Sequence, residues 1–127
     1  HIKNGGDYTT PEGKTIPHNR LTTPAAAPRS YAYCSDTVCQ RNIIPLIEGA
    51  DLLFHEATFA HADLARAKET FHTTATQAAE IACEAKVKQL LIGHFSARYE
   101  DESILLKEAR SIFPDTILAK ENLRINL

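Results

Sequence analysis

The chain has 127 residues, a net charge of −2 and an average composition, with 43% hydrophobic and 24% charged residues. This length and these fractions predict one folded globular domain and exclude a chain that is disordered throughout. The slightly negative charge excludes a uniformly basic nucleic-acid binder, so an RNA or DNA partner needs a local patch or a further part of the protein. Because the sequence contains neither a signal-peptide-like segment nor a long apolar span, we expect neither secretion nor membrane insertion.

The three cysteines, Cys34, Cys39 and Cys83, are an odd number and form no Cys-x-x-Cys pair. We therefore expect reduced thiols in a cytoplasmic protein. Zinc binding by Cys34 and Cys39 is a weaker alternative, because no second pair accompanies them. The chain begins with His1 and contains no methionine, so we expect it to be part of a longer protein.

Residues 1–29 are rich in glycine and proline, which predicts an irregular segment with short hairpin strands. The best strand candidates in it are 14–16 and 20–22. His1 and His18 are expected to be solvated surface residues, because neither ends a core element. Residues 30–127 form a second unit, in which strand and helix patterns alternate.

In chain order, this second unit begins with two strands and two helical segments. They are a strand over 30–34, a helix that ends near Gly49 with Pro45 in its first turn, a strand over 51–54 and a helical segment over 60–69. Thr74 and Gln77 then match a capping box, which predicts the clearest helix of the chain. The remaining elements are a strand over 90–92, a helix capped by Asp101 and ended by 113–114, and strands over 116–119 and 123–127. This alternation predicts a layered α/β domain with parallel strands.

Titratable side chains follow three successive strands of this unit. Asp36 follows the first strand, His55 and Glu56 the second, and His94 the third, directly after Gly93. Because parallel strands end at one rim of a sheet, we expect these residues to lie close together. A carboxylate and an imidazole at one rim suit zinc or a similar divalent ion. For His94 alone, a core histidine bound to a backbone carbonyl is the competing interpretation.

His72 precedes the capped helix, where free amides and the helix dipole disfavour an imidazolium unless a carboxylate opposes them. Glu56, at the end of the neighbouring strand, is the candidate for that carboxylate. A histidine oriented in this way can donate a proton to a leaving oxygen. The alternative is a histidine that only hydrogen-bonds to the backbone at the start of the helix.

Four motifs of the chain resemble, in order and approximate spacing, those of the ribonuclease Z family, the tRNA 3′-processing endoribonucleases of the metallo-β-lactamase superfamily. The motifs are Ser-Asp-Thr at 35–37, His-Glu-Ala-Thr-Phe at 55–59, His-Thr-Thr at 72–74 and Gly-His-Phe-Ser-Ala-Arg-Tyr at 93–99. The His-Glu-Ala-Thr and His-Phe-Ser-x-Arg-Tyr pair is the specific part of this resemblance, which runs from about 31 to 119. It implies an α/β fold that is the carboxyl-terminal half of a metallo-β-lactamase-type αββα sandwich.

The resemblance also implies a role for each matching residue. Asp36 would bridge two zinc ions and His94 would be a terminal ligand of one of them. His72 would donate the proton to the leaving ribose oxygen and would be held by Glu56. Three further residues, Arg98, Ser96 and Thr73, would lie where the phosphate or the acceptor end of the RNA passes. His55 is expected only to support its loop, and the resemblance further suggests a homodimer that acts on precursor tRNA.

The chain lacks the His-x-His-x-Asp-His motif that supplies most metal ligands in this family. We therefore expect the 127 residues alone to be inactive and to bind zinc weakly. Two alternatives stay open: another metallo-β-lactamase-fold hydrolase, acting on a phosphodiester or a small ester, or a catalytically silent interaction half-domain.

Overall fold

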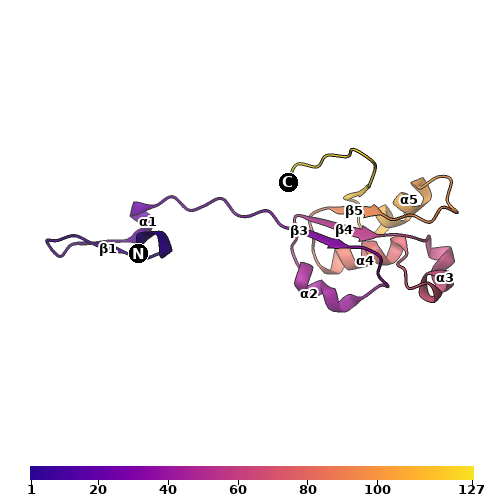
Figure 1. The fold of residues 1–127 in the computed structure, drawn as a ribbon, viewed down its shortest axis with the longest axis horizontal. Coiled ribbons are helices and arrows are strands. Elements are labelled where there is room, and N and C mark those ends of the chain that lie inside the picture. Colours follow the sequence, from indigo (N-terminus) through magenta and orange to yellow (C-terminus); the bar gives the residue numbers. More distant parts are fainter.

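Apolar segments after residue 30 form a four-stranded parallel sheet in the computed structural model, which describes all 127 residues (Figure 1). The strands are β3 (Tyr31–Cys34), β4 (Leu52–Glu56), β5 (Leu90–Gly93) and β6 (Thr116–Leu118). They pair in sequence order, each parallel to the next. All four strands therefore end at the same edge of the sheet, which is where ligand sites form in open α/β folds.

Helices connect the strands, and the two longest of them pack against one face of the sheet. The helices are α2 (Ile44–Ile47), α3 (Leu64–Glu69), α4 (Ala75–Glu84) and α5 (Ser103–Ile112), with the 3-10 turns η2 (Arg41–Ile43) and η3 (His61–Asp63). The buried alanines of α4 allow a close approach to Leu53, Leu90 and Ile92 of the sheet. The capping box is confirmed, since Thr74 Oγ1 accepts the Gln77 amide at 3.2 Å and Gln77 Oε1 accepts the Thr74 amide at 3.0 Å.

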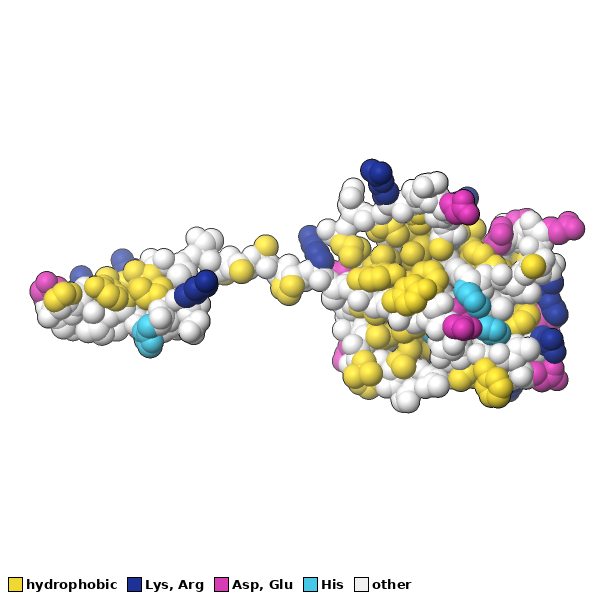
Figure 2. All heavy atoms as spheres, viewed as in Figure 1, with side chains coloured by type: hydrophobic (Ala, Val, Ile, Leu, Met, Phe, Trp, Pro, Cys, Tyr) yellow, Lys and Arg dark blue, Asp and Glu magenta, His cyan; other side chains and the backbone are white.

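The other face of the sheet is apolar and open. Tyr33, Phe54, Leu91 and Ile117 lie in register across the four strands on this face. Tyr33 is 64% exposed and stacks on Phe54 with ring centroids 4.7 Å apart. Figure 2 shows a broad hydrophobic area over this part of the body. Parallel sheets are normally covered on both faces, so this surface has the character of the inner face of a sandwich that needs a second layer.

A small separate unit precedes the body and is joined to it by an extended segment (Figure 1). Its elements are η1 (Ile2–Asn4), β1 (Tyr8–Thr9), β2 (Thr15–Ile16) and α1 (His18–Leu21). β1 and β2 pair antiparallel, as expected for the strand predicted over 14–16. The strand predicted over 20–22 is wrong: Pro17, with φ near −61°, begins a helical turn there.

Two further predictions are corrected by the structure. Residues 123–127 do not form a strand, because the chain turns at Asn122, with φ near 63°, and leaves the edge strand β6 unpaired beyond it. His55 and Glu56 do not follow the second core strand but are its last two residues.

The longest helices, α4 and α5, have ten residues each, and no helix is long and apolar enough to cross a membrane.

Candidate metal and proton-transfer site

Four side chains converge beyond the carboxyl edge of the sheet: Asp36, Glu56, His72 and His94. Asp36 lies after β3, Glu56 ends β4, His72 lies before α4 and His94 follows β5. One donor atom from each residue lies within 4.8 Å of the donor atoms of the others. Figure 2 shows histidine and acidic side chains side by side at the margin of the open apolar face.

The backbone of this cluster is in an uncommon conformation. Asp36 and His94 have φ near 53° and 61°, and Phe71, next to His72, has φ near 59°. A positive φ in a residue other than glycine costs on the order of 1–3 kcal/mol and concentrates at functional sites. The rest of the fold must hold these three positions, which is consistent with side chains placed for chemistry.

Glu56 is fully buried, and its carboxylate is the centre of the hydrogen bonding in the cluster. It accepts from the Thr37 amide at 2.5 Å, the Thr58 hydroxyl at 2.5 Å and the Thr73 amide at 3.0 Å. Burial by itself raises the pKa of Glu56, but these bonds and the one from His72 outweigh burial and hold the pKa below its ordinary value. The carboxylate is thus ionised, with its acceptor sites taken by protein donors, so Glu56 orients its neighbours rather than binding a metal.

His72 is oriented by that carboxylate. Its Nδ1 lies 3.1 Å from both oxygens of Glu56 and 3.9 Å from Oδ1 of Asp36. An ionised carboxylate only accepts hydrogen bonds, so Nδ1 carries a proton and Nε2 is the nitrogen left for other partners. This is the arrangement expected of a histidine that exchanges protons at Nε2.

Asp36 and His94 are the two exposed residues of the cluster. The Asp36 side chain is 79% exposed, and His94 is exposed as well. A carboxylate oxygen and an imidazole nitrogen fit zinc, but a zinc site needs about four ligands. These two residues therefore fit part of a metal site, which needs further ligands.

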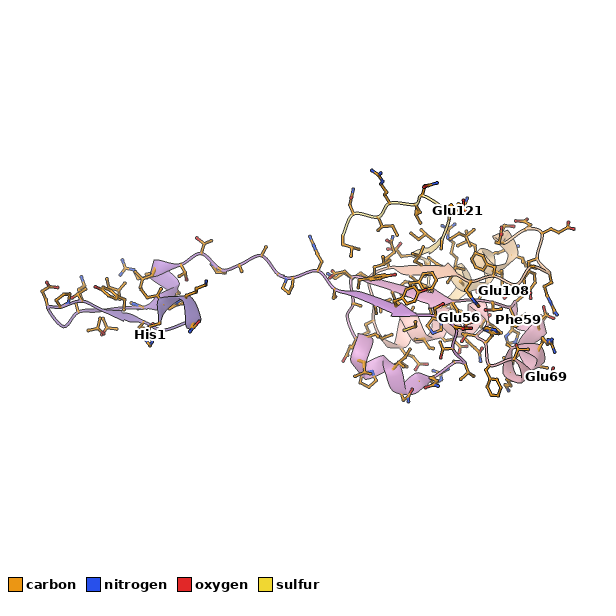
Figure 3. The ribbon with its side chains drawn as sticks, viewed as in Figure 1. His1, Glu56, Phe59, Glu69, Glu108 and Glu121 are labelled. Carbon is orange, nitrogen blue, oxygen red and sulfur yellow. The ribbon has the colours of Figure 1, made fainter.

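Arg98 lies beside the cluster on the loop after β5. Its Nη1 donates to Oδ1 of Asp63 at 2.8 Å, and its guanidinium lies 5.2 Å from the centre of the Phe59 ring. Phe59 in turn meets His72 edge to face, with ring centroids 6.1 Å apart; Figure 3 labels Phe59 and Glu56 in this part of the body. The side chain of Arg98 is 45% exposed, so it keeps donors free for an anion near His72.

One of the predicted residues is placed differently from the expectation, while His55, expected only to support its loop, is buried. Thr73 is fully buried and its hydroxyl donates to the Thr37 carbonyl at 2.7 Å, so its side chain ties two loops together and does not face a substrate. His55 is buried on the helix-covered face, because neighbouring strand residues point to opposite faces. Its Nδ1 donates to the Glu56 carbonyl at 2.8 Å, while Nε2 has no partner. Ser96 lies on the Arg98 loop, where its Oγ is 3.4 Å from the Arg98 amide.

Three residues that organise the site were given no role from the sequence: Thr58, Asp63 and Tyr99. Thr58 contacts Glu56 and His94, and the carboxylate of Asp63 accepts from both Tyr99 and Arg98. Thr58 could have been found, since it stands two positions after Glu56 and side chains at this spacing share a face. Asp63 lies in the 3-10 turn η3, and nothing in its local sequence indicates its contacts with Arg98 and Tyr99.

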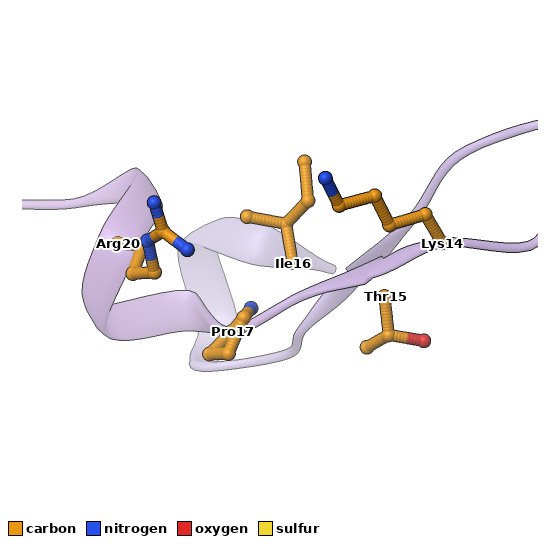
Figure 4. A pocket seen from close by; sticks show the side chains of 5 residues that line it. All are labelled: Lys14, Thr15, Ile16, Pro17 and Arg20. Carbon is orange, nitrogen blue, oxygen red and sulfur yellow. The ribbon is translucent and has the colours of Figure 1, made fainter.

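A shallow pocket of about 170 Å³ lies in the small N-terminal unit and not at the cluster. Its lining residues are Lys14, Thr15, Ile16, Pro17 and Arg20. Figure 4 shows Lys14, Ile16 and Arg20 extending to the same side of the segment. No metal-binding set of side chains accompanies this pocket.

Known proteins resemble the chain in both sequence and fold, although no protein-family model matches it. Ribonuclease Z of Phocaeicola vulgatus is 70% identical over 126 residues, and that of Bacteroides fragilis 69%; each match covers 99% of this chain and 41% of the relative. The chain therefore spans about two fifths of the length of these relatives.

Among solved structures, the metallo-β-lactamase fold protein YhfI from Bacillus subtilis aligns with a TM-score of 0.69 at 29% identity, over 75% of this chain and 39% of YhfI. Human short-form tRNase Z aligns with a TM-score of 0.54 at 33% identity, over 73% of this chain and 30% of the human protein. The chain belongs to the ribonuclease Z family, and its parallel sheet is part of a metallo-β-lactamase fold.

Proposed function

We propose that the protein carrying this chain is a zinc-dependent endoribonuclease that removes the 3′ trailer from precursor tRNA. The close relatives carry the name ribonuclease Z, and a solved neighbour is a tRNase Z. The observation that supports the proposal most is the buried Glu56 carboxylate at 3.1 Å from Nδ1 of His72. That pair provides an oriented proton donor at the edge of the sheet where parallel α/β folds bind their ligands.

His72 is the proposed proton donor. With Nδ1–H bound to Glu56, a protonated imidazole carries its second proton on Nε2, the nitrogen not engaged by Glu56. Glu56 compensates the positive charge of that imidazolium. Donation of the Nε2 proton to the leaving ribose oxygen would then leave a neutral imidazole whose orientation is unchanged. General acid catalysis of this kind contributes about 10²- to 10⁴-fold in rate.

Asp36 and His94 are the residues of this chain that would hold zinc, with further ligands supplied from outside it. When bound, zinc would offset the negative charge of the phosphodiester and stabilise the attacking and leaving oxygens. Arg98 and Ser96 are proposed to contact the phosphate or the acceptor end of the RNA. The guanidinium suits this because it is fixed by Asp63 and partly exposed.

The proposal extends to the assembly and location of the protein. The family resemblance supports a homodimer. The cysteines, none of which is paired, support a reducing compartment such as the cytoplasm.

A cleavage assay on precursor tRNA with the full-length protein tests the proposal. His72→Ala should lower turnover by at least about 10²-fold while zinc content stays near that of the wild type. His61→Ala is the matched control, since His61 is exposed on η3 and lies outside the cluster. Equal turnover in the two variants would exclude the proton-donor role.

Metal content distinguishes Asp36 from His72. Asp36→Ala should lose zinc, because it removes the carboxylate available to the ion, whereas His72→Ala should not. Equal zinc content in both variants would overturn this assignment. The 127-residue chain alone should leave precursor tRNA uncleaved, and mature 3′ ends formed by it in zinc would contradict the division of the site.

The two alternatives give different results in the same experiments. A metallo-β-lactamase-fold hydrolase of another class would cleave simple phosphodiesters or esters but not precursor tRNA. A silent interaction half-domain would do neither. The intact set of Asp36, Glu56, His72 and His94 favours an enzyme over the silent module.

A further inference from the structure

Thr58 is the one side chain within hydrogen-bond distance of Nδ1 of both histidines of the site. It stands two residues after β4 proper ends at Glu56, and it is 6% exposed. Its Oγ1 lies 2.5 Å from Oε2 of Glu56, 2.9 Å from Nδ1 of His94 and 3.4 Å from Nδ1 of His72. A hydroxyl in this position decides which groups donate and which accept.

The direction of each bond follows from the donors available. A hydroxyl has one proton, and an ionised carboxylate can only accept, so Thr58 donates to Glu56. The Thr58 oxygen must then accept at its contact with His94, which places a proton on Nδ1 of His94. In the neutral imidazole, Nε2 of His94 is then the nitrogen without a proton and keeps its lone pair.

This contact is the only hydrogen bond of the His94 ring. The residue is exposed, and the other close ring is that of His72, with centroids 5.3 Å apart. A free neutral imidazole can carry its proton on either nitrogen, and only an unprotonated nitrogen binds a metal. Metal-ligating histidines generally have the other N–H fixed by a hydrogen-bond acceptor. In this structure the acceptor is a hydroxyl that is itself fixed by a carboxylate.

We infer that Thr58 is a positioning residue: its hydroxyl holds His94 with Nε2 free for a metal and links it to the carboxylate that orients His72. One buried carboxylate therefore sets the protonated nitrogen of both histidines, directly in His72 and through Thr58 in His94. The metal part of this inference rests on the proposed function, while the position of the proton on His94 does not.

Substitution can separate the hydroxyl from the rest of Thr58. The Thr58 carbonyl accepts the Ser96 amide at 3.0 Å, a backbone contact that any side chain preserves. Thr58→Val keeps the branched shape and replaces only the hydroxyl, by a methyl group, so it isolates the proposed bond. Thr58→Ser keeps the hydroxyl and is the matched control.

The experiment is a long-range ¹H–¹⁵N correlation spectrum of the histidine rings in the full-length, metal-free protein, above pH ~8, where an ordinary imidazole is neutral. We expect His94 to be protonated on Nδ1 in the wild type and in Thr58→Ser. In Thr58→Val the population with the proton on Nε2 should rise. A proton on Nε2 of His94 in the wild type would overturn the inference without any variant, and so would an unchanged His94 in a folded Thr58→Val.

Titration with Zn²⁺ alone gives the second measurement. Thr58→Val should bind Zn²⁺ about 10- to 100-fold more weakly than the wild type, as expected when the partner of a ligating histidine is lost. Thr58→Ser should stay within a few-fold of the wild type. Equal affinity in Thr58→Val and the wild type would remove the link to the metal. Because neither measurement uses RNA, failure to cleave precursor tRNA would contradict the proposed function and leave the position of the proton standing.

Discussion

Nδ1 of His72 lies at the same distance, 3.1 Å, from both oxygens of the Glu56 carboxylate. The carboxylate is fully buried and also receives the Thr37 and Thr73 amides. A surface carboxylate could turn away from a histidine, but this one is fixed by three loops at once. The geometry of His72 is therefore a property of the fold.

Glu56→Gln should damage both function and stability. The amide keeps the shape but replaces one acceptor by a donor, which leaves at least one buried partner unsatisfied. We expect the free energy of unfolding to fall by about 1–3 kcal/mol. We also expect turnover on precursor tRNA to fall by ~10²-fold or more, because His72 loses its orienting acceptor. Chemical unfolding and cleavage kinetics measure the two effects; a variant with full turnover would contradict the role of Glu56.

Arg98→Ala should weaken substrate binding more than it lowers turnover. The Arg98 guanidinium is held by Asp63 and Phe59 beside His72. The substitution therefore removes a fixed hydrogen-bond donor for the phosphate. We expect KM to rise by about 10-fold, which corresponds to ~1.4 kcal/mol of binding free energy. Arg66→Ala is the control, because Arg66 forms only an exposed pair with Glu69 on α3. An equal change of KM in both variants would mean that Arg98 acts through general charge alone.

The sequence predicted the sheet and the convergence of chain segments better than it predicted individual contacts. Glycine and polar residues after short apolar runs mark strand ends reliably, which is why Asp36 and His94 were placed at one edge. His55 and Glu56 are adjacent in sequence, and only the pleat of β4 decides that Glu56 reaches the cluster while His55 enters the core. Local sequence gives no information on which loop a buried hydroxyl will meet, so the turn of Thr73 toward Thr37 was missed.

Gly93→Ala should destabilise the end of β5. A Cβ at this position would lie 2.8 Å from Cε2 of Phe54 and 3.0 Å from Cβ of Ala119, closer than packed carbon atoms allow. We expect a loss of about 1–3 kcal/mol in the free energy of unfolding, as for other overpacked sites. Urea unfolding measures it, with Gly13→Ala as a contrast in which a Cβ meets no atom and only the backbone, with φ near 85°, is strained. A Gly93→Ala protein as stable as the wild type would show that Phe54 can move away freely.

His55 should make the fold sensitive to mild acid. Burial lowers the pKa of His55 below its ordinary value of 6.5, although its bond to the Glu56 carbonyl and the Glu56 charge act in the opposite direction. As the pH falls below 6.5, the unfolded chain takes up a proton on this residue that the folded chain does not bind. The unfolded state is then favoured, so the free energy of unfolding decreases toward acid, by at most about 1.4 kcal/mol per pH unit from this group.

His55→Asn isolates that contribution. The asparagine amide can still donate to the Glu56 carbonyl, but it is smaller than the fully buried imidazole, so the variant should lose stability at neutral pH. Because the amide does not titrate, the decrease in stability below pH 6.5 should be shallower. Unfolding in urea at several pH values, for both proteins, measures the difference between the two slopes. Identical slopes would mean that the folded protein protonates His55 as readily as the unfolded chain does. In that case the imidazole must find an acceptor for Nε2, which has none in this structure.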